Sequence, residues 1–142
     1  MKKLLTLILS IFILTGCLAS AYTNGDIDWI AMGPEFTATR ADNVAVITER
    51  DQITEPWTHI GLIRIKNVAP NYTARDGAIM KARRFTAKKG ASAILIREVF
   101  VSGEEGGDNG FVLSAYALKY RSDLKPEDKE RFGEAEDVKI NK

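Results

Sequence analysis

Histidine and cysteine, the side chains that most often hold soft metal ions, each occur once in this sequence. His59 is the single histidine and Cys17 the single cysteine among 142 residues. A zinc-type site takes several such ligands, so one chain cannot complete it. His59 follows Pro56 and Trp57 just ahead of an expected strand, a position typical of a surface or hydrogen-bonded histidine. The sequence predicts no metal site and no cofactor.

Three acidic side chains within a glycine-rich run could in principle bind calcium. Glu104, Glu105 and Asp108 lie within residues 103–110. A calcium loop needs oxygen ligands at alternating positions, as in D-x-[DN]-x-[DN]-G, and this run lacks that spacing. Its glycines suit a turn between two strands, so we expect a solvated hairpin tip.

A second group of charged residues falls between two expected strands and comprises Glu49, Arg50, Asp51 and Glu55. A pair of carboxylates there could do acid–base work, but that chemistry needs a pocket and a perturbed pKa. No nucleophile or oxyanion motif accompanies the group. We therefore expect a charged loop, and a protein that is not an enzyme.

The most specific pattern lies at the N-terminus. The chain opens Met1-Lys2-Lys3, and residues 4–14 are apolar except for Thr6 and Ser10. This apolar segment is shorter than the roughly 20 residues of a membrane-spanning helix, and its plan is that of a secretory signal peptide. It ends in Leu14-Thr15-Gly16-Cys17, which resembles the lipobox of bacterial lipoprotein precursors.

The lipobox resemblance implies how the protein is processed and where it lies. In that family the signal peptide is cut before the cysteine, whose thiol and new amino group receive fatty acyl chains such as palmitate. Several acyl chains hold a protein stably on a membrane, whereas one does so only marginally. We therefore expect lipidation of Cys17. Leu18 stands where an aspartate tends to retain enterobacterial lipoproteins in the inner membrane, which favours the periplasmic face of the outer membrane.

Length and charge limit the remaining functions. Cleavage after residue 16 would leave about 126 residues, the size of one small domain. The formal net charge is +1, so no global field would attract nucleic acid. The expected divisions are a signal peptide over 1–16, a lipidated tether over 17–25, a single domain over 26–121 and a charged tail over 122–142.

Hydrophobic periodicity predicts four strands and one main helix. The four expected strands are residues 44–48, 60–66, 93–101 and 111–120, which are rich in β-branched and alternating apolar residues. Residues 27–30 could form a further brief strand or a docking segment. The helix lies between the second and third strands. Thr73 would cap it, with Asp76 three residues later in an approximate capping box, and Gly90 would end it.

The order β-β-α-β-β predicts an α+β fold, with a mixed four-stranded sheet and one main helix on one face. The last strand is apolar on both of its sides, as expected of a strand that is buried on both. One helix covers one face of a sheet. The second face must therefore be covered by the segment around Trp29, by the C-terminal tail or by a partner.

Residues 59–96 resemble a pattern found in many small bacterial lipoproteins. Its parts are a strand that begins Ile60-Gly61-Leu62-Ile63, a helix with A-x-x-x-A spacing, and the run Lys89-Gly90-Ala91-Ser92-Ala93-Ile94. The lipid-anchored stress sensor of the Rcs phosphorelay and the YbjQ-like family share this layout. The resemblance implies a fold type and an envelope interaction module. The Rcs sensor's domain is held by disulfides, which this chain has no cysteines to form.

Two sets of side chains are candidates for binding. Interfaces favour large aromatic residues, although such residues could also fill the domain's own core; this set comprises Trp29, Trp57, Tyr116 and Tyr120. Cations on the expected helix could contact anionic lipid or glycan, or could form a solvated face. This set comprises Lys81, Arg83, Arg84, Lys88 and Lys89.

These observations favour a non-enzymatic, lipid-anchored envelope protein that acts as a protein-interaction or sensor module. Its partners would be the membrane, through the lipid, and another envelope protein. The alternative is a periplasmic lipoprotein that binds a small ligand or a metal ion. Neither function involves nucleic acid.

Overall fold

The computed structural model describes residues 26–100 and 111–136 of the chain. The predicted signal peptide, the lipobox with Cys17 and the tether precede this range. The predicted hairpin tip with Glu104, Glu105 and Asp108 falls in the gap. These predictions therefore lie outside the described residues.

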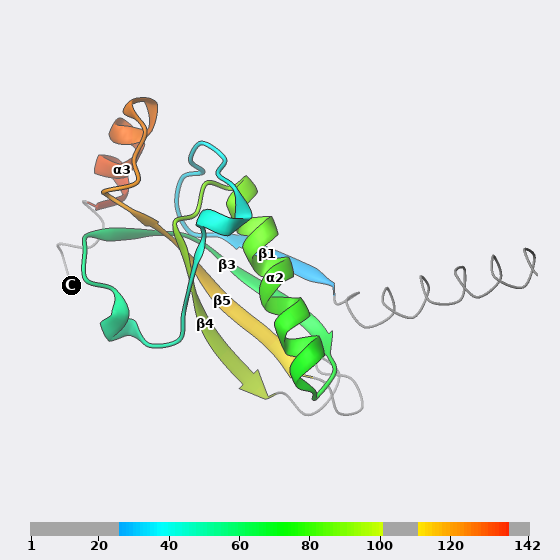
Figure 1. Ribbon diagram of the computed structural model, residues 1–142. Coiled ribbons are helices and arrows are strands. Elements are labelled where there is room, and N and C mark those ends of the chain that lie inside the picture. The colour runs from blue at the N-terminus through cyan, green and yellow to red at the C-terminus, as the bar shows by residue number, and fades with distance from the viewer. Residues whose placement is uncertain (1–25, 101–110, 137–142) are drawn as a thin grey trace, which may run out of the picture.

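A five-stranded sheet forms the centre of the domain (Figure 1). Its strands are β1 (Ile27–Ala31), β2 (Ala45–Ile47), β3 (Trp57–Val68), β4 (Ala93–Phe100) and β5 (Phe111–Tyr120). They lie in the order β1-β3-β5-β4-β2. β2 runs parallel to β4, and the other neighbouring strands are antiparallel. The predicted α+β class and mixed sheet are confirmed.

The predicted number of four strands is wrong, because the segment Ile27–Ala31 adds a fifth strand at one edge. β3 is 12 residues long, and β1 pairs with its middle, from Ile65 to Gly61. The edge of a long strand presents unpaired N–H and C=O groups, which an extended neighbouring segment can satisfy. A segment of five residues is too short for its hydrophobic pattern to predict this pairing from the sequence.

The main helix, α2 (Tyr72–Lys88), lies across one face of the sheet (Figure 1). Its predicted cap is wrong: Asn71, rather than Thr73, is the N-cap, and its Oδ1 accepts a hydrogen bond from the N–H of Ala74 at 2.8 Å. Asparagine caps helices at least as well as threonine. The predicted stop is confirmed, since Gly90 follows the helix with a φ of 81°, which a residue without Cβ adopts freely.

Small side chains let α2 lie close to the sheet. Ala78 and Ala82 are buried on the helix, and Ala115 and Ala117 are fully buried on β5. Larger aliphatic side chains of the strands fill the space beside them: Ile60, Ile63, Ile65, Ile94, Ile96 and Leu113. This burial, at about 25 cal/mol per Å² of apolar surface, is the main stabilising term of the domain.

A second helix, α3 (Lys129–Glu136), lies beyond the end of the sheet at which β5 ends (Figure 1). Phe132 is 2% exposed, and its ring centroid lies 6.5 Å from that of Phe36. Asp128 is also buried, and it accepts hydrogen bonds from the backbone N–H and the hydroxyl of Thr37 at 3.1 and 3.2 Å. Residues of the predicted charged tail thus complete the core on the α2 side.

Trp29 fixes β1 to that same side. Its ring packs against Phe85 of α2, with 5.5 Å between the ring centroids, and it lies directly over Gly61 of β3. A Cβ at position 61 would overlap the indole, so glycine is what allows the close approach. Its Nε1 is buried and has no hydrogen-bond partner among the residues that the structure describes, a cost that this packing must offset.

Candidate functional site

The face of the sheet opposite α2 is only partly covered, and we call it the open face. Trp29 and Phe132 both pack into the core on the α2 side, so neither β1 nor α3 covers the open face with these side chains. Side chains alternate between the two faces along each strand. The strand register therefore aligns the residues of the open face in rows that cross the sheet.

One of these rows is apolar. Ile30 lies opposite Leu62, Leu62 opposite Tyr116, and Tyr116 opposite Leu95. Ile30 is 49% exposed and the other three are half-buried, while Met32, just beyond β1, is 51% exposed. Contiguous exposed apolar surface marks binding sites, whereas single exposed apolar residues are ordinary. This row has the character of a binding surface.

The adjacent row is polar and cationic. Arg64 lies opposite Ser114, and Ser114 opposite Arg97, so two arginines flank one small side chain. Neighbouring strands are about 4.8 Å apart, which lets both long side chains reach one group above Ser114. Asp28 continues the row beyond Arg64, and its carboxylate pairs with Lys66 at 2.9 Å. Arginine is the side chain best suited to hold a carboxylate with two hydrogen bonds.

The connection between β2 and β3 closes one end of the open face. Ile53 of this connection packs with Trp57 and Tyr120 around the buried Leu118. Gln52 holds the turn in shape, because its side-chain oxygen accepts hydrogen bonds from two consecutive backbone N–H groups at 3.1 and 3.2 Å. The connection covers this face at the end of β5 where Tyr120 lies. In the two rows, Ile30 and Arg97 are exposed, whereas Ser114 is buried between the arginines.

A cavity of about 430 Å³ lies where the covered end meets the rows. It is lined by Met32, Thr48, Arg50, Trp57, His59, Leu95, Ile96, Arg97 and Tyr116. The guanidinium of Arg50 lies over the Trp57 ring, 5.9 Å from its centroid, and Arg97 supplies a second cation. Aromatic walls with a few convergent charges are typical of binding sites for groups that are partly apolar and partly anionic.

His59 organises the aromatic wall of this cavity. Its ring meets Trp57 edge-on, with 4.6 Å between centroids and 88° between planes, and lies 5.2 Å from Tyr116. Such contacts are worth about 0.5–1.5 kcal/mol each beyond simple burial. Among residues 26–100 and 111–136, no three histidine, cysteine, aspartate or glutamate side chains gather as a metal site would require.

Tyr120 contributes a protonated phenol at the covered end. Burial raises the pKa of this phenol above its usual 10.0, and the carboxylates of Glu55 and Asp123 raise it further. A phenol with a raised pKa remains a hydrogen-bond donor through the physiological range.

The predicted aromatic set is divided between the two faces. Trp57, Tyr116 and Tyr120 lie together on the open face, and Trp29 lies on the α2 side. Of the predicted charged loop, Arg50 lines the cavity, whereas Glu49, Asp51 and Glu55 do not. The structure therefore gathers aromatic and cationic groups at this site rather than paired carboxylates.

The predicted cationic set on α2 also divides. Arg83 serves the fold, since its Nε donates to the carbonyl of Val44 at 2.9 Å and its Nη2 to that of Asp42 at 3.3 Å. Lys89 forms an ion pair with Glu35. The remaining members are exposed or half-buried: Lys81, Arg84 and Lys88.

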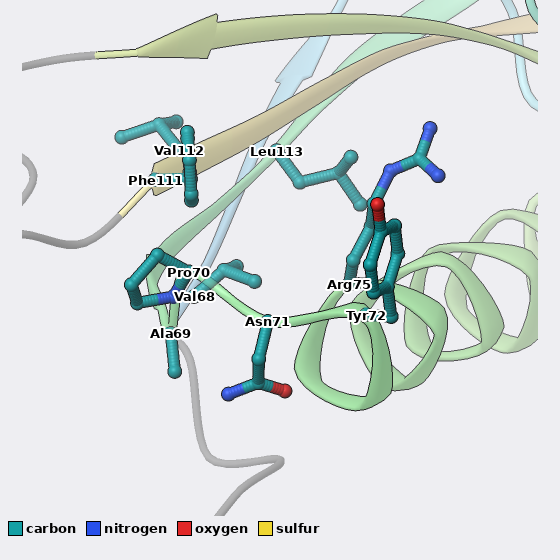
Figure 2. Close-up of a pocket in the computed structure, with 9 residues that line it drawn as sticks. All are labelled: Val68, Ala69, Pro70, Asn71, Tyr72, Arg75, Phe111, Val112 and Leu113. Atoms are coloured by element: carbon teal, nitrogen blue, oxygen red, sulfur yellow. The ribbon is translucent and has the colours of Figure 1, made fainter.

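A second cavity, of about 400 Å³, lies at the other end of the sheet (Figure 2). Apolar side chains of the β3–α2 turn and of the start of β5 line most of it, and Figure 2 shows Tyr72 and Arg75 together at one side. Three of its lining residues, Phe111–Leu113, directly follow residues 101–110 in the sequence. Because residues 101–110 lie outside the described residues, we assign the cavity no ligand.

Sequence reasoning did not single out the two rows, although a signal for them is present. The tripeptide Leu-Ile-Arg occurs twice, at Leu62–Arg64 in β3 and at Leu95–Arg97 in β4. In a strand, its leucine and arginine share one face. The register then sets both leucines beside Tyr116 and both arginines beside Ser114, which only the long-range pairing reveals.

Neither a comparison with protein-family models nor one with curated proteins gives a match for this chain. Among solved structures it is similar to the crystal structure of a Francisella virulence factor, FvfA, with 19% sequence identity and a TM-score of 0.46. That similarity covers 65% of this chain and 97% of the other. Within the described residues, no helix is both long and apolar enough to cross a membrane.

Proposed function

We propose that this chain is a non-enzymatic, lipid-anchored bacterial envelope protein that binds another envelope protein through its open face. The observation that carries the proposal is the pair of adjacent rows, Ile30–Leu62–Tyr116–Leu95 and Arg64–Ser114–Arg97. The anchor rests on the lipobox resemblance at Leu14–Cys17. We further propose the periplasmic face of the outer membrane as its location.

The apolar row supplies the driving force for binding. Covering it would remove Ile30, Met32 and the exposed parts of Leu62, Leu95 and Tyr116 from water, and apolar burial is the main favourable term in most protein associations. Aromatic residues at the centre of an interface often contribute most of the affinity. Tyr116 lies between two leucines, so it is the expected centre.

The cations define the partner's chemistry. Arg64, Arg97 and Arg50 lie along or beside the apolar row. Complementary charge gives an interface its specificity and register. The fitting occupant is a protein segment that presents apolar side chains beside carboxylates.

In-cell photo-crosslinking tests the binding face. A photoreactive residue at Leu62 is expected to capture one envelope protein, and the same probe at Leu95 to capture the same protein. Tyr72 is the control position, because it is 84% exposed and belongs to α2, and a probe there should not capture that partner.

A charge reversal tests the recognition of carboxylates. Arg97→Glu should lower the yield of the Leu62 adduct at least about fivefold, which corresponds to about 1 kcal/mol. Arg84→Glu is the matched control, since Arg84 is equally an exposed arginine but lies on α2, and it should leave the yield unchanged. Equal effects of both reversals would contradict the proposal.

A membrane surface is the competing occupant of the open face. If the Leu62 probe captures lipid instead of protein, and the unlipidated protein binds anionic vesicles in a manner lost with Arg97→Glu, the open face is a membrane contact and the proposal fails. The anchor itself is tested by the intact mass of the native protein beside a Cys17→Ala variant. Acyl mass on a chain that begins at Cys17, absent from the variant, is the expected result.

A further inference from the structure

A small polar pocket lies on the α2 side of the sheet, apart from the open face. Its volume is about 230 Å³, and it is lined by Thr37, Thr39, Asn43, Ala91, Ser92, Lys119, Asp123 and Lys125. Lys119 lies near the end of β5, two residues beyond the buried Ala117, and so continues the α2-facing side of that strand. The pocket therefore occurs where β5, the segment before β2 and the turn before α3 meet.

Lys119 is the unusual member of this pocket, because it is a lysine that is only 4% exposed. Buried lysines are rare unless they are paired. Its ammonium lies 5.8 Å from the centroid of the Phe36 ring, but no hydrogen bond or ion pair to it occurs within the part of the chain that the structure describes. Its three N–H donors therefore have no acceptor among the described residues, and Lys119 is one of the residues that line the pocket.

The neighbouring carboxylates do not neutralise this ammonium by direct contact. Asp128 accepts hydrogen bonds from Thr37 and lies 3.9 Å from Arg131, and Asp123 is exposed at the rim. Burial lowers the pKa of Lys119; Asp123 and Asp128 oppose that shift, and Lys125 adds to it. An acceptor placed inside the pocket would relieve the burial cost.

Hydroxyl groups complete the donor set. Ser92 is buried, and its Oγ accepts a hydrogen bond from the N–H of Tyr120 at 3.1 Å, which leaves its own O–H to donate. Thr39 Oγ1 accepts from the Asn43 amide at 3.4 Å, so its O–H is likewise left to donate. These donors come from different elements and surround one small volume.

We propose that this pocket binds a small, singly charged oxyanion, a carboxylate or a monoanionic phosphate group, with Lys119 as its principal contact. The small volume suits a compact ligand, and the ammonium with two hydroxyls matches the acceptor-rich surface of an oxyanion. Asp123 at the rim would repel a second negative charge, which selects for one charge. Lys125, at the same rim, would attract the anion.

This proposal is independent of the open face. Bound oxyanion would link Lys119 to the segment 37–43 and to the turn that leads into α3. A ligand that binds only the folded state stabilises it, so occupancy would raise the stability of the whole domain. The partner-binding proposal neither requires nor excludes that ligand.

NMR of the whole chain labelled with ¹³C-lysine tests the proposal directly. The Lys119 Cε resonance, assigned by its loss in Lys119→Met, should shift saturably with acetate or phosphate and should titrate at higher pH when the anion is bound. Chloride at equal ionic strength should have no saturable effect. Dimethyl phosphate separates a lipid-type phosphodiester from free phosphate or carboxylate as the preferred source.

Two variants keep the test decisive even if Lys119→Met fails to fold. Lys125→Gln, at the exposed rim, should weaken anion affinity about two- to fivefold, as loss of one solvent-exposed charge contact does. Lys88→Gln on α2 is the matched control and should leave affinity unchanged. If the resonance does not shift saturably with any oxyanion, or shifts equally with chloride, the pocket is a water site and the proposal is overturned.

Discussion

The contact between Trp29 and Gly61 gives a sharp test of how β1 joins the sheet. A Cβ at position 61 would overlap the far ring of the indole and approach three of its carbons. Overfilling a packed core costs about 1–3 kcal/mol, and we expect Gly61→Ala to cost an amount in this range. For a domain of this size, each kcal/mol lowers Tm by about 4 °C, so urea and thermal unfolding followed by circular dichroism will resolve the change.

A double-mutant cycle isolates the cause of that loss. Trp29→Ala removes the ring, at an expected cost of about 2–3 kcal/mol because the indole is only partly buried. In that background Gly61→Ala should cost less than about 0.5 kcal/mol, so the coupling between the two sites should exceed about 1 kcal/mol.

A control substitution at a second glycine distinguishes steric overlap with Trp29 from the general effect of replacing glycine by alanine. Gly77 lies inside α2 and does not have a positive φ, so Gly77→Ala should stabilise the protein by up to about 1 kcal/mol through helix propensity. If Gly61→Ala is neutral, or if its cost persists without Trp29, β1 does not dock as described. Ile30 would then lose its assigned place in the apolar row.

The remaining predictions concern the two ends of the domain and its pH dependence. Phe132→Ala should lower the free energy of unfolding by about 3–5 kcal/mol, because the ring is 2% exposed; a loss below about 1 kcal/mol in urea titrations would mean that α3 is not part of the core. Arg83→Ala should cost about 1–2 kcal/mol through its lost bonds to two backbone carbonyls, whereas Arg84→Ala should stay within about 0.5 kcal/mol. The pKa of Lys119 is lowered from 10.5 in the folded state, so the unfolded chain binds more protons below that pH, and stability should rise as the pH increases towards 10.5. Lys119→Met should remove that rise, and an unchanged slope in unfolding titrations against pH would refute the assignment.

The predicted elements of the fold were those with long, regular patterns. The sequence predicts a strand over residues 111–120, which are the observed bounds of β5, because this segment is apolar on both sides over its whole length. The helix stop at Gly90 followed from a local backbone requirement. For residues 27–30 the sequence leaves a brief strand and a docking segment as alternatives. The pairing of Ile27–Ala31 depends on the length of β3 and on the absence of a side chain at Gly61, and both of these features lie far away in the sequence.

The sequence predicts the candidate site only in part, because the site depends on strand pairings between residues that are far apart in the sequence. Trp57, Tyr116 and Tyr120 were singled out by residue type, and all three lie on the open face. Trp29 was grouped with them, although its ring packs under α2. The sequence does not point to Lys119, since a lysine in an apolar strand is usually a solvated residue, and its neighbour Phe36 is distant in sequence.

The two faces of the sheet are built from different kinds of side chain, and this difference favours a binding role for the open one. On the α2 side, alanines let the helix pack closely against the sheet, so that the interior between them is filled. On the open face, Leu62, Leu95 and Tyr116 are half-buried, and the arginines at 64 and 97 follow in the next row. Arginines that served only to prevent self-association would be replaceable by any charge. Arginines that recognise carboxylates could not be replaced by a negative charge, so Arg97→Glu separates the two roles. If the variant stays monomeric but no longer captures the partner, Arg97 acts in recognition.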